Sequence, residues 1–282
     1  MSIPKTMTAV SENYHTTCLQ EPQVRAKIQR LESDLEQFWQ GPGLQLPDSA
    51  PGRDAELWVP GVFEKRKGLS DRAEQARLLH NLANIELQAM ELAFRTYAEF
   101  PHAPKDFREQ LGALALSESR HLELCLDQLE ELGFTWGTWP VHLNLWAAVS
   151  SEDSLLDRLL IVHRYLEACG LDSSTALQRR LVQSQAPHVE KTVKVIAEEE
   201  VGHVAFGSYW YHEICELEGL NPEEDFPARL RRLEARLPKR IESLNVELRR
   251  AAGFLDQELQ AAEGLRRSFL SASFLPGARS GA

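Results

Sequence analysis

Apolar residues recur every three to four positions along most of this 282-residue chain, which is the spacing of amphipathic helices. One helix is predicted near the N-terminus, at residues 22–40. Five longer helical segments are predicted at residues 71–99, 106–132, 153–184, 188–218 and 227–262. No run alternates apolar and polar residues between turn signals, as a half-buried strand would. The pattern therefore predicts an all-α protein.

Prolines and glycines separate the long segments and indicate how they connect. Pro101 and Pro104 end the first long helix, and Pro187 separates the third from the fourth, because proline interrupts helical hydrogen bonding. A longer crossover at residues 133–152 joins the second helix to the third. The first four helices thus form two hairpins with one long connection, which is the topology of a ferritin-like four-helix bundle.

This reading divides the chain into three parts. We expect an N-terminal extension, partly irregular, then the four-helix bundle, then a single C-terminal fifth helix with an irregular tail packed on the bundle. The expected boundaries are residues 1–60, 61–220 and 221–282.

Two copies of one arrangement of charged residues lie within the four bundle helices. Each copy has a single glutamate on one helix and a Glu-x-x-His motif on the next, at nearly equal separations. The residues are Glu86 with Glu118 and His121, and Glu167 with Glu200 and His203. Positions i and i+3 share a helix face, and apolar residues flank these on the same stripes. Four carboxylates and two imidazoles facing one core are the ligand set of a di-iron or di-manganese site.

A single Glu-x-x-His is a weak signal, because the motif also occurs at Glu12/His15 in the N-terminal tail and at Glu99/His102. The second of these is interrupted by Pro101, which disfavours helical spacing. A single buried glutamate is also well explained by a salt bridge. Four core-facing carboxylates without matching lysines or arginines are not, since burying them is costly unless they are paired or bind metal.

Mixed oxygen and nitrogen ligation without thiolate suits iron or manganese. The predicted cofactor is therefore two iron ions, with manganese or a mixed iron/manganese pair as alternatives. The expected arrangement gives each metal one histidine and one terminal carboxylate, with two shared carboxylates: Glu86 and His121 on one metal, Glu167 and His203 on the other, and Glu118 and Glu200 between them.

Composition narrows the class of protein further. The formal charge of −11 argues against nucleic acid as the main partner. The four cysteines are widely spaced and form no C-x-x-C, which argues against a rubredoxin-type iron site, a zinc knuckle and a disulfide framework. The N-terminus shows no signal peptide and the chain no apolar run long enough for a membrane span. We therefore expect a cytoplasmic protein with no membrane partner.

Several stretches carry a resemblance to known proteins. They are LLHNLANIELQAMELA (78–93), SESRHLELCLDQLEELGFTWGTWPVHLNLW (117–146), RLLIVHRYLEACGLD (158–172), EEEVGHVAFGSYW (198–210) and NVELRRAAGF (245–254). Over about residues 55–255 the chain resembles the ferritin-like superfamily of di-iron carboxylate proteins, and more narrowly the ferritin-like domain-of-unknown-function family 455. The resemblance implies a di-metal site on the same six residues. It departs mildly before the last histidine, where Glu199-Glu200 replaces the usual Asp-Glu.

Two residues outside the ligand set are predicted to support it. His163 lies one helical turn before Glu167 on the same stripe and is the best candidate for orienting that carboxylate. Arg249, in the segment that follows the bundle, is expected to pair with a carboxylate.

These features favour an oxidoreductase that activates dioxygen or peroxide and oxidises a small-molecule substrate, for example as a hydroxylase or monooxygenase. The substrate and the electron donor stay open. Two alternatives belong to other classes: a ferroxidase or iron-handling protein, and a helical binding protein that metal stabilises. The oligomeric state also stays open, with a homodimer as one option.

Overall fold

The computed structural model describes residues 16–41, 46–47, 49–58 and 67–273. Within these ranges every regular element is a helix, and the only extended pairing is an isolated bridge between Leu57 and Val141. The all-α prediction is confirmed. No helix in the described part of the chain is long and apolar enough to cross a membrane.

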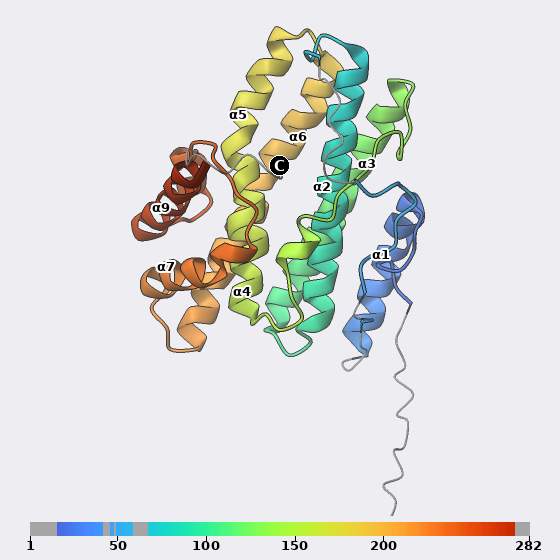
Figure 1. Cartoon of the computed structure of the whole chain (residues 1–282). Helices are drawn as coiled ribbons and strands as arrows, with labels where there is room; N and C mark the ends of the chain where they lie inside the picture. The colour runs from blue at the N-terminus through green and yellow to red at the C-terminus, as the bar shows by residue number, and fades with distance from the viewer. Residues whose placement is uncertain (1–15, 42–45, 48, 59–66, 274–282) are drawn as a thin grey trace, which may run out of the picture.

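Four long helical segments lie side by side in the centre of the molecule, and shorter helices flank them (Figure 1). The central segments are α2 (Arg72–Glu99), α3 (Lys105–Glu131), the continuous run of α4 (Leu155–Leu159), η2 (Leu160–Glu167) and α5 (Ala168–Gln183), and α6 (Pro187–Leu217). The flanking elements are α1 (Val24–Gln40), η1 (Trp146–Ala148), α7 (Pro222–Leu233), η3 (Glu234–Arg236), α8 (Val246–Ala251) and α9 (Asp256–Ser273). The central helices begin and end within about two residues of the predicted limits, which is the usual uncertainty of helix ends.

Local sequence explains where the central helices begin. The Asp71 carboxylate accepts a hydrogen bond from the Ala73 N–H at 2.9 Å and caps α2. Ser154 and Asp157 form a reciprocal capping box at the start of α4. Pro187 occupies the first turn of α6, where its missing N–H costs nothing.

The third central segment is not a uniform α-helix. Residues Leu160–Glu167 form a π-helical stretch, η2, between α4 and α5. π-Helical turns are rare and occur often at functional sites. Every residue of η2 is buried, so this stretch places side chains on both the bundle side and the C-terminal side of the helix.

The prediction of one C-terminal helix over 227–262 is wrong. The chain forms α7, η3, α8 and α9 there instead. Pro238 follows shortly after η3, and Gly253 has a φ of +85° between α8 and α9, a left-handed conformation that glycine adopts readily. These two residues break the helical run that the apolar pattern suggested. The expected tail at 274–282 lies outside the described residues.

A buried ion-pair cluster fastens the N-terminal part of the chain to α2. Glu91 is fully buried and accepts hydrogen bonds from both Nη atoms of Arg53 at 2.5 and 2.6 Å. Lys27 of α1 lies 2.9 Å from the same carboxylate and is also fully buried. Both cations contact the Glu91 carboxylate, and Lys27 also donates to the carbonyl oxygens of Cys18 and Leu19 at 2.9 Å, so each buried charge has partners, the condition under which buried charges are tolerated.

A second buried ion pair fastens α9 to η2. Arg164 donates to both carboxylate oxygens of Glu258 at 2.6 and 2.7 Å, and both side chains are fully buried. His212 and the Leu255 N–H approach the same carboxylate at 3.0 and 2.7 Å. Burial alone would raise the pKa of Glu258, but His212 and Arg164 outweigh it and lower the pKa to about 2.

The prediction that Arg249 pairs with a carboxylate is confirmed. Its guanidinium binds Asp172 of α5 at 2.6 and 2.9 Å. The contact holds α8 against α5, on the outer side of the segment that carries Glu167.

Candidate metal centre

The two Glu-x-x-His motifs meet between α3 and α6. Glu118 and His121 come from α3, and Glu200 and His203 come from α6. One potential ligand atom from each of these four side chains lies within 4.8 Å of the others. Each pair shares one helix face because its members are three residues apart, so packing the two faces together brings four ligand-type side chains to one point.

Glu118 lies between the two imidazoles. Its Oε1 is 2.7 Å from His203 Nδ1, and its Oε2 is 3.6 Å from His121 Nδ1. Glu200 also lies between them, with Oε1 at 3.5 Å from His121 Nδ1 and 3.3 Å from His203 Nδ1. Both carboxylates that the sequence predicts to be shared therefore approach both histidines.

The short distances in this cluster are not hydrogen bonds. Glu118 is fully buried, yet neither of its oxygens accepts a hydrogen bond, and the Nδ1 atoms of His121 and His203 are also without one. Leaving buried polar atoms unsatisfied is costly, and native proteins do it rarely. Carboxylate and imidazole atoms that converge without hydrogen-bond geometry suit a shared cation.

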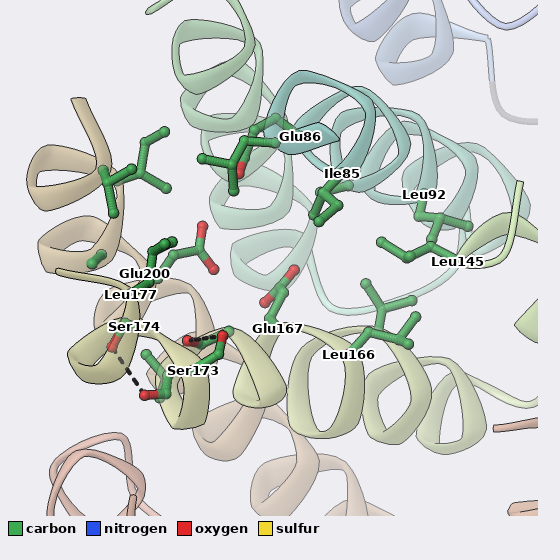
Figure 2. Close-up of a pocket in the computed structure, with 18 residues that line it drawn as sticks. Ile85, Glu86, Leu92, Leu145, Leu166, Glu167, Ser173, Ser174, Leu177 and Glu200 are labelled. Atoms are coloured by element: carbon green, nitrogen blue, oxygen red, sulfur yellow. Dashed lines mark hydrogen bonds between the residues drawn. The ribbon is translucent and has the colours of Figure 1, made fainter. Parts of the chain in front are cut away.

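Glu86 and Glu167 approach the cluster from α2 and η2. Glu86 Oε2 is 3.5 Å from His121 Nδ1. The Glu167 carboxylate is contacted by His163 Nδ1 at 2.8 and 2.9 Å, as predicted from their one-turn spacing. Glu86, Glu167 and Glu200 line one cavity (Figure 2), so all six predicted ligands gather in one part of the molecule.

The basic side chains beside the four carboxylates are histidines. Within the described residues, no lysine or arginine forms an ion pair with Glu86, Glu118, Glu167 or Glu200. Burial raises the pKa of Glu86 well above its usual value, and the neighbouring charges of Glu118 and Glu200 raise it further. The pKa of Glu167 is raised for the same reasons, although His163 opposes the shift.

The imidazoles show the same demand for positive charge. Burial alone would lower their pKa values, but the adjacent carboxylates of Glu118 and Glu200 outweigh it and raise the pKa of His121 to about 12 and that of His203 to about 11. Burial likewise opposes ionisation of Glu118, but the two histidines lower its pKa well below the usual range. The cluster thus stabilises positive charge strongly, whether protons or metal ions carry it.

Glu199 supports the site in a way that the sequence did not reveal. Its Oε2 lies 3.0 Å from His121 Nε2 and accepts a hydrogen bond from Ser117 Oγ at 3.3 Å. A metal-binding histidine usually donates its other ring N–H to a carboxylate, which fixes the ring and its tautomer. With Nε2 engaged by Glu199, the Nδ1 atom of His121 faces Glu86, Glu118 and Glu200.

His163 is held in place by a close approach of η2 to α6. A Cβ added at Gly207 would lie 2.3 Å from the His163 Cβ, a distance at which one of the two must move. Glycine at 207 therefore permits this packing. His163 is fully buried, and its Nε2 has no hydrogen-bond partner, so its one polar contact is the Glu167 carboxylate.

A cavity of about 150 Å³ adjoins the cluster between α2, the η2–α5 segment and α6. In Figure 2, Glu86, Glu167 and Glu200 point towards the space between these helices, with Leu92, Leu145 and Leu166 on one side and Ser173, Ser174 and Leu177 on the other. The rest of the lining is mainly aliphatic. Glu86, Glu167 and Glu200 therefore form part of the wall of this cavity.

Residues 15–260 match a family described as "Protein of unknown function (DUF455)". The chain belongs to this family. The DUF455 match includes all six predicted ligands together with His163 and Glu199. A similar protein of Haemophilus influenzae (strain ATCC 51907 / DSM 11121 / KW20 / Rd), described as "Uncharacterized protein", is 30% identical over 214 residues, which are 72% of each chain. No solved structure matches the chain significantly.

Proposed function

We propose that this DUF455 protein is a ferritin-like oxidoreductase that uses two bound metal ions to activate dioxygen or peroxide. The observation that carries the proposal is the fully buried Glu118, whose two oxygens lie between the Nδ1 atoms of His121 and His203 without accepting a hydrogen bond. The pairing of α2 with α3 and of α5 with α6, joined by a long crossover, supports the ferritin-like arrangement.

Six residues would hold the metals, with Glu118 and Glu200 shared between them. Glu86 and His121 would serve one metal, and Glu167 and His203 the other. Oxygen and nitrogen ligands without thiolate favour iron or manganese. When bound, such metals supply a redox change and a template for the reacting molecules.

The surrounding residues prepare the site for this chemistry. Glu199 orients His121, and His163 orients the Glu167 carboxylate. The helices exclude bulk water from Glu118, which strengthens every electrostatic interaction around it. Four carboxylates would balance the charge of two divalent cations.

The adjoining cavity favours an organic substrate over iron handling alone. A ferroxidase needs a path for hydrated iron, whereas this compartment is lined mainly by aliphatic side chains such as Ile85, Leu166 and Ile196. The cavity therefore supports oxidation of a small molecule as the reaction, and places that molecule beside Glu86, Glu167 and Glu200.

Elemental analysis of the purified full-length protein tests the metal centre. The test variant is Glu118→Ala/Glu200→Ala, and the matched control is Glu123→Ala/Glu216→Ala, which removes exposed glutamates from the same two helices. We expect two metal ions per chain in the wild type and the control, and loss of both in the test variant. Absence of stoichiometric metal, or equal metal in the test variant, would overturn the proposal.

The redox step needs a second measurement. Wild-type protein loaded with ferrous iron in the absence of air is then exposed to dioxygen, and iron oxidation is followed by absorbance and by oxygen uptake. We expect faster oxidation by the wild type than by the Glu118→Ala/Glu200→Ala variant. Stoichiometric metal that does not react with dioxygen or peroxide would contradict the oxidoreductase and favour the metal-stabilised binding protein.

A further inference from the structure

The cavity beside the carboxylates has an identifiable mouth. Of its lining residues, Gly170 and Ser173 of α5 are exposed, while Leu82 and Ile85 of α2 are half-buried. The space therefore opens between α2 and α5 and continues inward to Glu86 and Glu167. A molecule that entered here would reach the candidate ligands without unfolding any element.

The size of the cavity limits what fits inside. Its volume of about 150 Å³ equals that of a well-known engineered cavity that binds benzene. The aliphatic part of the lining offers ordered water few polar partners. The cavity thus suits a group of about six or seven carbon atoms.

The polar groups of the lining do not favour a charged or strongly polar ligand. Ser173 and Ser174 donate their hydroxyl hydrogens to the carbonyl oxygens of Gly170 and Leu171 at 3.2 and 3.0 Å. No lysine or arginine lines the cavity within the described residues. The remaining polar groups are the carboxylates of Glu86, Glu167 and Glu200, which repel anions and would serve as ligands of bound metal ions.

We propose that this cavity binds the reacting part of the substrate, and that this part is an uncharged hydrocarbon group of about six or seven carbons, such as a phenyl ring. Its role as substrate rests on the proposed function. Aliphatic contacts with Leu82, Leu92 and Leu166 would hold the group by burying apolar surface. The carboxylates on the inner wall would then face its C–H bonds.

Gly170 offers a direct way to close the mouth. A Cβ at this position meets nothing within 4 Å, so Gly170→Leu would place a side chain at the entrance without disturbing the backbone. The change also replaces glycine with a good helix former, so lost binding would not reflect lost folding. Gly264→Leu in α9 is the matched control, because a Cβ there also meets open space far from the cavity.

The test is binding of three probes of similar size to the full-length protein, measured by NMR titration with and without added metal. The probes are toluene, benzoate and benzylammonium. We expect saturable toluene binding in the wild type and Gly264→Leu, a weakening of about tenfold or more in Gly170→Leu, and no saturable binding of benzoate. No saturable toluene binding, or equal binding by Gly170→Leu, would overturn the proposal, as would tighter binding of benzylammonium than of toluene to the metal-loaded protein.

Enlarging the cavity gives an independent check. Leu177 lines one end, and Leu177→Ala should increase the affinity for naphthalene relative to toluene, since it removes side-chain volume there. An unchanged ratio of naphthalene affinity to toluene affinity would contradict the proposal that the hydrocarbon group binds in this cavity. Binding of toluene needs no metal, so a protein that binds toluene but takes up no stoichiometric metal would overturn the proposed function and leave the pocket assignment standing. Stoichiometric metal without toluene binding would overturn the pocket assignment and leave the proposed function standing.

Discussion

The π-helical stretch η2 presents buried charge on two sides, and the two sides are built on opposite principles. Towards the C-terminal helices, Arg164 meets Glu258, and both carboxylate oxygens receive guanidinium donors. Towards the bundle core, Glu167 contacts His163 and belongs to a group of carboxylates with which no lysine or arginine of the described residues forms an ion pair. On the first side, the charges of Arg164 and Glu258 neutralise each other. On the second side, the carboxylates need protons or metal ions to neutralise them. Buried charge on one element can therefore serve stability on one face and binding on the other.

Removing one partner of the closed side should have the largest effect on folding. Glu258→Ala leaves Arg164 buried without a carboxylate partner, with cation–π contacts to Tyr211, Phe226 and Phe254, and we expect a loss of about 3–5 kcal/mol in the free energy of unfolding. Urea denaturation measures it, and metal content per folded chain should not change. A loss of metal without a loss of stability would reverse the roles assigned to the two sides.

Acid should weaken the closed side through the same carboxylate. The pKa of Glu258 is lowered from 4.5 to about 2 in the folded protein, so its stabilisation is complete above pH 4.5 and is lost as the pH falls towards 2. Glu258→Gln cannot ionise. The difference in free energy of unfolding between wild type and this variant should therefore shrink over that interval, as measured by urea denaturation at a series of pH values. A constant difference would show that the Glu258 charge contributes no net stability.

Crowding η2 from the bundle side should affect both stability and binding. Gly207→Ala forces the His163 Cβ away from a contact of 2.3 Å, and we expect a cost of about 1–3 kcal/mol from overpacking together with weaker metal binding, because His163 orients Glu167. Thermal unfolding and metal titration measure the two effects. Gly202→Ala on the same helix meets open space, so it should not destabilise the fold. Equal stability of the two variants would show that the close approach is not a constraint.

The smallest expected effect concerns the orientation of His121. Glu199→Gln weakens the contact to His121 Nε2 while keeping the side-chain shape, and we expect metal affinity to fall about 10- to 100-fold with full occupancy at saturating metal. Competition with a chelator measures the affinity. Glu198→Gln is the control, because Glu198 is exposed and pairs with Lys194 at 3.8 Å. Identical affinities for the two variants would remove Glu199 from the site.

The motif spacing anticipated the gathering of the candidate ligands because it depends on helical periodicity alone. Glu118 and His121 had to share a face once α3 was helical, and the same held for Glu200 and His203. The contact of Glu199 with His121 could not be predicted, because it depends on how α3 and α6 are aligned along each other, which a single sequence does not show. Its neighbour Glu200 already filled the core-facing position.

The irregular parts of the chain were harder to predict for different reasons. The residues of η2 are buried on all sides. No solvent-facing polar stripe therefore distinguishes an α-helix from a π-helix in this stretch of the sequence. The C-terminal region did contain signals, at Pro238 and Gly253, but the continuing apolar spacing masked them. Where tertiary packing determines the backbone, the local sequence pattern predicts that a segment is helical but not its exact ends or its type of helical turn.

The π-helical stretch also has a consequence for how this chain tolerates changes in length. A π-turn holds one more residue than an α-helical turn, and each residue rotates an α-helix by about 100°. Deleting one residue within 160–163 would let η2 tighten into a regular α-helix with α4 and α5 kept nearly in phase, whereas the same deletion in a uniform α-helix would turn one end by about 100° relative to the other. This segment can therefore gain or lose a single residue without turning Arg158 and the rest of α4 away from the partners that they now contact.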